Sequence, residues 1–203
     1  MKVVTGLFDT YDDARDAVKA LEDASVPSDQ ISIVSRKGGK EDVEGQGNNA
    51  AEGAGTGAGI GAVAGGAGGL LAGLGMLAIP GVGPVVAAGW LAATAAGAAA
   101  GAVVGGAAGG IVGALIESGI SEKDAHVYAE ALRRGGSVVV AKVDDNRALE
   151  AQTILTNLQP VDLDRRRTNY VNEGWSRFDD KAAPYTSDQI TEERRRYFTD
   201  RGL

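Results

Sequence analysis

The chain contains no cysteine and only one histidine, His126, among its 203 residues. Without cysteine there is no disulfide framework, no thiolate nucleophile and no thiolate ligand for a metal. A single histidine also leaves the usual metal and general-base arrangements without their commonest member. We therefore expect no catalytic residues, no metal and no cofactor, and we expect that the protein is not an enzyme.

An excess of positive charge is also missing. There are 20 basic against 27 acidic residues, which gives a formal net charge of −7. Such a balance argues against a nucleic-acid partner, which needs a basic footprint. The two short basic clusters, Arg165-Arg166-Arg167 and Arg194-Arg195-Arg196, have acidic neighbours. We interpret them as a solvated face or as partners for an acidic neighbouring subunit; binding of anionic lipid headgroups is the remaining alternative.

All charge is absent from residues 53–116. This block holds 21 Gly and 20 Ala but only 18 residues of Val, Ile, Leu and Met. Pro80-Gly81-Val82-Gly83-Pro84 predicts a turn that divides the block into two arms, Gly53–Ile79 and Val85–Ile116. Each arm is longer than the roughly 20 residues that an apolar helix needs to cross a bilayer.

Glycine weakens a helix by up to about 1 kcal/mol relative to alanine, so its abundance here needs a reason. Its spacing supplies one, because a four-residue repeat places small residues along one helix face, where a second helix can approach closely. We therefore predict a packed helical hairpin, a glycine zipper, over 53–116; the alternative is a Gly-rich disordered or looped segment. Its helix-packing interface consists of Gly53, Gly57, Gly61, Gly65, Gly69, Gly73, Gly97, Gly101, Gly105, Gly109 and Gly113.

The charged segments before and after this block have similar sequence patterns. Residues 3–8 and 31–34 have the composition of strands, and Thr10 with Asp13 predicts a capped helix between them. Residues 138–144 and 161–163 repeat the strand pattern around a second amphipathic helix over 148–158. Ser121 with Asp124 predicts the cap of a further helix that connects the block to the second half.

Two βαβ halves predict an α+β fold, a ferredoxin-like βαβ–βαβ antiparallel sheet that carries the helical hairpin as an insertion. The expected divisions are 1–36 for the first half, 37–52 for a polar linker and 53–116 for the hairpin. Residues 117–166 form the connecting helix and second half. Residues 167–203 form a charged tail whose scattered aromatic residues dock on another surface; the alternative is a disordered tail.

The first half resembles a known family. The run V-V-T-G-L-F-D-T-Y-D-D-A-R-D-A-V-K-A-L-E-D-A, followed by Pro27, Asp29 and I-S-I-V-S, is similar to the general stress protein 17M-like (YflT-like, heat-induced stress protein) domain. The later S-E-K-D-A-H-V-Y-A-E-A-L-R-R-G-G and V-V-V-A-K-V extend the likeness to about residue 165. This resemblance implies a bacterial, stress-associated protein, and it brings no catalytic or ligand-binding residues.

Together these observations predict a non-enzymatic stress-associated protein whose glycine-zipper hairpin mediates self-association. Two settings remain open for the hairpin: a lipid bilayer, at the cytoplasmic face of the bacterial inner membrane, or a soluble cytoplasmic homo-oligomer that serves as a scaffold or shell. Residue 1 begins no signal peptide pattern, so we expect the chain to start in the cytoplasm. A small-ligand sensor that uses the sheet face is a further alternative, by analogy of fold alone.

Overall fold

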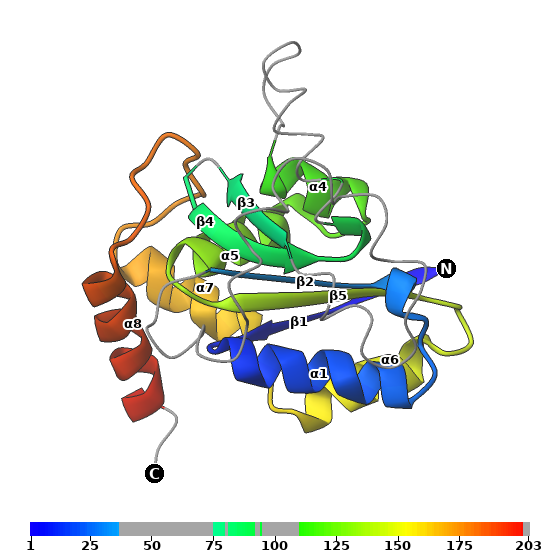
Figure 1. Cartoon of the computed structure of the whole chain (residues 1–203). Coiled ribbons are helices and arrows are strands. Elements are labelled where there is room, and N and C mark those ends of the chain that lie inside the picture. Colours follow the sequence, from blue (N-terminus) through cyan, green and yellow to red (C-terminus); the bar gives the residue numbers. More distant parts are fainter. Residues whose placement is uncertain (37–74, 80, 92–93, 95–109, 201–203) are drawn as a thin grey trace.

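The computed structural model describes residues 1–36, 75–79, 81–91, 94 and 110–200 (Figure 1). These residues form one antiparallel sheet with helices on both of its faces. The five strands are β1 (Lys2–Phe8), β2 (Ile31–Arg36), β3 (Gly75–Ile79), β4 (Gly83–Ala88) and β5 (Ser137–Val143). Their order across the sheet is β1-β5-β2-β4-β3.

One face of the sheet is covered by α1 (Tyr11–Asp23) and α6 (Ala148–Asn157), and the other by α4 (Ile111–Glu117) and α5 (Glu122–Arg133) (Figure 1). Side chains alternate along each strand, so neighbouring residues enter opposite cores. Val139 of β5 packs with Leu21 of α1, in the core that α1 and α6 cover. Val138 and Val140 belong to the other core, with Leu132 of α5.

The predicted caps are present. Thr10 precedes α1, and its hydroxyl accepts a hydrogen bond from the amide of Asp13 at 3.1 Å. Ser121 precedes α5 and accepts from the amide of Asp124 at 3.1 Å. Each cap satisfies an amide that the first helical turn leaves without a partner, so these helix starts could be located from local sequence.

The predicted ferredoxin-like order is only partly present. Its first three strands correspond to β1, β2 and β5, with β5 in the middle as that order requires. The fourth, Val161-Asp162-Leu163, is not a strand: Leu163 begins α7 (Leu163–Asn172), and the Asp162 side chain caps it by accepting from the amide of Arg165. The amide of Val161 donates a hydrogen bond to the Leu7 carbonyl of β1.

The predicted helical arms are wrong next to the central turn. The chain does turn there, with Gly81 and Gly83 at positive φ, but β3 and β4 flank it, and the pair extends the sheet beyond β2. Val85, fully buried, joins the same core as Leu132. Branched residues favour strands, and β2 presents an edge on which they can pair, so tertiary burial overrides the helical spacing here. Further along the block, residues 111–116 are helical, within α4.

Residues 37–52, the predicted linker, lie outside the described residues, as do 53–74 and 95–109 of the predicted hairpin. Among the helices that the structure does describe, none combines the length and the apolar character needed to cross a membrane. Parts of the uncharged block belong to the same domain as the sheet, because residues 79, 82, 85, 91, 111 and 115 are buried in the core.

Candidate functional site

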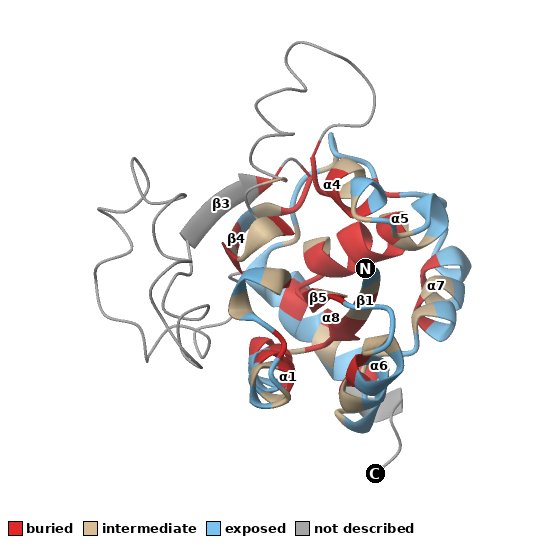
Figure 2. Cartoon of the chain, turned by 90° about the vertical axis from the view of Figure 1, so that its right-hand side faces the viewer, coloured by how far each residue is buried: buried red, intermediate tan, exposed pale blue. Residues whose placement is uncertain are grey.

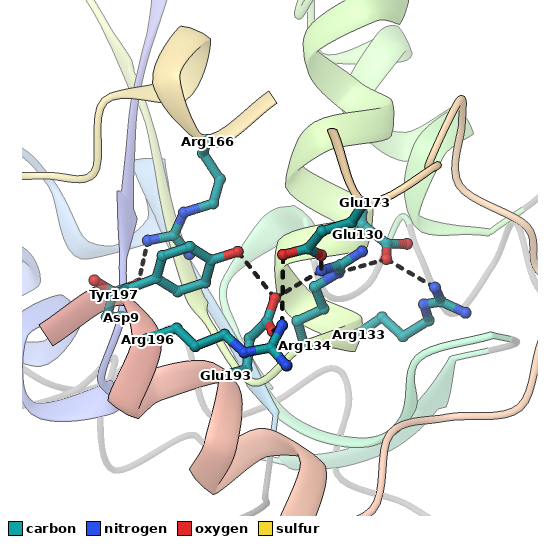
Figure 3. A network of polar contacts seen from close by, with 9 residues as sticks. All are labelled: Asp9, Glu130, Arg133, Arg134, Arg166, Glu173, Glu193, Arg196 and Tyr197. Carbon is teal, nitrogen blue, oxygen red and sulfur yellow. Dashed lines mark hydrogen bonds and ion pairs between the residues drawn. The ribbon is translucent and has the colours of Figure 1, made fainter. Parts of the chain in front are cut away.

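Charged residues gather where the C-terminal part of the chain meets the end of α5. Glu130 and Arg133 lie in the last turn of α5, and Arg134 is the C-cap residue that follows it. Opposite them are Glu173, directly after α7, and Glu193 of α8 (Ser187–Asp200). Figure 3 shows these side chains pointing toward one another. We call this cluster the tail network.

Arg134 is the centre of the tail network. Its Nε donates to Glu130 Oε1 at 2.7 Å and its Nη1 donates to Glu193 Oε1 at 2.7 Å. Nη1 also donates to Glu173. Arg134 and Glu193 each keep only 6% of their side-chain surface, and Glu130 keeps none. Buried charges require such partners, because an unpaired charge away from water is strongly destabilising.

The guanidinium of Arg134 keeps its charge in this setting. Burial by itself would lower the pKa of Arg134, but hydrogen bonds to Glu193, Glu130 and Glu173 outweigh burial and raise that pKa above its ordinary value. The ring of Tyr170 in α7 lies 4.1 Å from the guanidinium carbon, measured to the ring centroid. Arg134 is therefore held by ion pairs on its edges and by an aromatic ring on one side.

A second ion pair continues the network toward the sheet. Arg166 of α7 donates to the carboxylate of Asp9, just after β1, at 2.6 Å, and both are buried. The guanidinium carbon of Arg166 lies 3.5 Å from the ring centroid of Tyr197 in α8. The Tyr197 hydroxyl donates to Glu193 at 2.9 Å, which joins the two sets of charges (Figure 3).

Two tyrosines of this region are held in their neutral form. Burial raises the pKa of Tyr170, and the nearby cations Arg166 and Arg134 offset only part of that rise. Burial is also the largest cause that raises the pKa of Tyr197. With Val127 of α5, both rings form a small apolar cluster beside the ion pairs.

Neighbouring parts of the tail reach the sheet. Phe178, 6% exposed, belongs to the core that contains Ile79 and Val85. Nη2 of Arg36, at the end of β2, donates to the carbonyl of Tyr185 at 2.5 Å. Trp175, Phe178 and Tyr197 of the predicted docking tail thus pack against hydrophobic residues of the same chain. Most of α5, which contributes Val127 to the cluster of Trp175 and Tyr197, is buried (Figure 2).

Two shallow hollows flank α7 and share Asn169 and Tyr197. The larger, about 640 Å³, lies between α7 and α8, and the smaller, about 290 Å³, lies against the loop before α7. The charged residues that line the larger hollow are two glutamates and two arginines, whereas those of the smaller are Asp162, Arg165 and Arg166. Among the described residues, no group of three or more acidic or histidine side chains is arranged to hold a metal ion. What this arrangement does chemically is fasten the C-terminal helices to α5 and β1.

The glycines predicted as the helix-packing interface are not brought together in the described part of the chain. Gly113 lies in α4 and is partly buried. The other ten, Gly53, Gly57, Gly61, Gly65, Gly69, Gly73, Gly97, Gly101, Gly105 and Gly109, lie outside the described residues. The zipper stays a prediction.

The tail network itself was missed by sequence reasoning. Its only local signal is the spacing of Glu130, Arg133 and Arg134, at three and four residues along one helix. The decisive partner, Glu193, is 59 residues away from Arg134, and no local pattern indicates that distance. The basic clusters were expected on a solvated face or against another subunit, whereas Arg166 and Arg167 pair with carboxylates of the same chain.

Residues 3–80 match the model of the heat-induced stress protein YflT domain. This confirms the resemblance drawn from the opening strand, helix and second strand, and the matched range extends through β3. No curated protein and no solved structure matches the chain.

Proposed function

We propose, from the match of residues 3–80 to the heat-induced stress protein YflT domain, that this chain is a non-enzymatic, stress-associated bacterial protein that self-associates through its Gly/Ala-rich stretches. The match itself suggests the stress-associated role. The observation that supports self-association is the absence of charged residues from 53–116, since all of the chain's charged residues lie in the other 139 positions.

The described fold narrows the part of the block that is available for this role. Residues 75–79, 81–91 and 110–116 contribute strands, a turn and α4 to the domain. The stretches 53–74 and 95–109 remain, and they contain ten of the eleven glycines with four-residue spacing. Small residues at that spacing allow close approach of two backbones.

The chain leads to both stretches from the same end of one strand pair. β3 begins at Gly75, which lies opposite Ala87 in the register, and β4 ends at Ala88. Residue 74 directly precedes β3, and residues 89–91 lead from β4 toward 95–109. This supports a joint role in which the sheet and its helices carry the Gly/Ala-rich stretches.

The setting that we propose is the cytoplasmic face of the bacterial inner membrane. An uncharged, small-residue surface can be desolvated by lipid at little cost, because no side chain in it carries a charge. A soluble homo-oligomer would bury the same surface against a second copy. The two settings are separated by flotation with lipid vesicles, since only the first gives lipid-dependent assembly.

The test replaces Gly61 and Gly105, each inside a run of four-residue spacing, by leucine. Matched controls are Gly59→Leu and Gly106→Leu, which make the same change in the same stretches but off the runs. Overpacking a close helix contact costs about 1–3 kcal/mol or more, so we expect assembly to weaken at least tenfold in the first pair alone. Sedimentation velocity with and without vesicles gives the mass. Equal assembly of all four variants and the parent rules out the zipper.

A further inference from the structure

Residues 173–197 cross the surface of the domain as a strap. Of these 25 residues only Phe178, Ile190, Glu193 and Tyr197 are buried. The strap leaves α7 at Glu173, passes the turn between β3 and β4, and returns along the end of α5 as α8 (Figure 1). It is fixed at a few points, with long exposed stretches between them.

Two of these points lie on the β3–β4 turn. A side chain at Gly81 would come within 2.7 Å of the Asp179 carbonyl and of the Asp180 Cα, and one at Gly83 would come within 3.0 Å of Pro184. The strap backbone therefore lies directly on Gly81, and the ring of Pro184 lies on Gly83. Phe178, which precedes Asp179 in the chain, is part of the core.

A third point lies where β2 ends. Arg36 donates to the Arg133 carbonyl at 2.9 Å and to the Tyr185 carbonyl at 2.5 Å, so it bridges α5 and the strap. Arg36 is also paired with Val85 of β4 in the sheet register. Only four residue pairs, Ile33–Ala88 to Arg36–Val85, join β4 to β2. The strap is thus a substantial part of what holds the β3–β4 pair on the sheet.

The bonds that hold α8 are ionic in large part. When α8 leaves, Glu193 and Arg134 regain water, and Arg134 still has Glu130, so no charge is left buried without a partner. A buried ion pair is only slightly more favourable in free energy than its two charges in water, so separating the pair costs little. A fully apolar interface would instead lose all of the free energy gained by removing its surface from water. The strap can therefore open at a lower free energy than the sheet, as a local unfolding unit.

We propose that the strap is an intramolecular latch: seated, it holds the β3–β4 pair against β2, and released, it frees that pair, to which the Gly/Ala-rich stretches are joined in the chain. The control of assembly rests on the proposed function, whereas the hold on the β3–β4 pair does not. Release then increases association with a second copy of this chain.

The test reverses one charge in the full-length chain. Glu193→Lys places a cation against Arg134, and Glu192→Lys, the matched control, makes the same change at the preceding residue, whose carboxylate pairs with Arg195 at the surface. Hydrogen–deuterium exchange is followed for 187–197, for 79–88 and for β1 with β5. We expect exchange of the first two regions to rise about tenfold or more in Glu193→Lys alone, with β1 and β5 unchanged.

Each other outcome is decisive. Faster exchange of α8 with an unchanged β3–β4 pair, or no change in either, overturns the latch. If β1 and β5 also exchange faster, the variant has unfolded, and Glu193→Gln, which keeps an acceptor for Arg134, replaces it under the same criteria.

Sedimentation of the same samples tests the link to assembly. We expect the concentration needed for association to fall about tenfold in Glu193→Lys, in proportion to the open fraction. An unchanged concentration, with the β3–β4 pair loosened, overturns the control of assembly. If parent and variant are both monomers at every concentration, the proposed self-association fails, while the exchange data still decide whether the strap holds the β3–β4 pair.

Discussion

Glycine is required at position 135, after the end of α5, for two reasons: its backbone conformation and its contact with α8. Its φ is +95°, a left-handed conformation that side chains disfavour. A Cβ at this position would also lie 2.3 Å from Cγ2 of Ile190 in α8. The carbonyl of Gly135 accepts from Arg194 at 3.0 Å. One small residue therefore ends α5 and seats α8.

We predict that Gly135→Ala lowers the free energy of unfolding by about 2–4 kcal/mol, because it adds overpacking against Ile190 to backbone strain. Gly174 is the control, since its φ is +88° and nothing lies within 4 Å of a Cβ there. Gly174→Ala should cost only the backbone strain, about 1 kcal/mol. Chemical denaturation of both variants gives the difference, and equal losses would show that Ile190 does not contact Gly135.

Tyr170 and Tyr197 make the seating of the tail sensitive to alkali. Because burial raises the pKa of both phenols in the folded chain, the folded state favours their neutral forms. Their contribution to stability is complete below the ordinary tyrosine pKa of about 10 and is lost as the pH rises above it.

We therefore expect α8 to detach as the pH rises above about 10, with the tyrosinate absorbance of these residues appearing together with that detachment. Ultraviolet titration of the parent beside Tyr197→Phe measures it. The variant should lose part of the late absorbance step. Tyrosinate absorbance that rises entirely at the ordinary tyrosine value would contradict the burial of these rings.

At the level of elements, β3 and β4 are integral to the sheet although they come from an uncharged block. Val85 is fully buried in β4 and pairs with both Arg36 of β2 and Leu77 of β3 in the register. Removing 53–116 would therefore remove two strands and α4, and the remaining residues would not form this domain unchanged.

Ala87→Asp tests that role. Ala87 is 3% exposed, and its register partners are Val34 of β2 and Gly75 of β3, so a carboxylate there meets no cation on the neighbouring strands. We expect a loss of about 3 kcal/mol or more in the free energy of unfolding. Leu149→Asp on α6 is the control, because Leu149 is 80% exposed and its change should stay within about 0.5 kcal/mol. Thermal unfolding followed by circular dichroism compares them. Two equally stable variants would place β4 outside the core.

At the scale of the whole molecule, we propose that a charged domain carries the uncharged stretches 53–74 and 95–109, and that these stretches mediate assembly. Ala99→Asp introduces a charge into the second stretch, where a packed or lipid-facing surface must desolvate it at a cost of about 3 kcal/mol or more. We expect assembly and vesicle binding to fall, while the circular dichroism of the domain stays that of the parent. Unchanged mass and flotation would show that Ala99 meets water.

Local sequence was sufficient for most of the flanking elements. The helices α1 and α5 begin at their predicted caps, Thr10 and Ser121, because a cap depends on residues only three positions apart. The strands β1, β2 and β5 follow from short runs of branched residues. The fourth predicted strand was lost because Asp162 caps a helix there, a competing local signal of similar strength.

What the sequence determined by itself is the set of capped helices, three strands and a block without charge, since each depends on neighbours within one or two turns of the chain. Only the tertiary structure decided that β3 and β4 form strands that extend the sheet, where helices were predicted. It also decided that Glu193 pairs with Arg134. Both depend on burial between segments far apart in the sequence. The partner of a strand edge or of a buried guanidinium is whichever segment lies next to it in the fold. The pattern of residues along the chain does not indicate which segment that is.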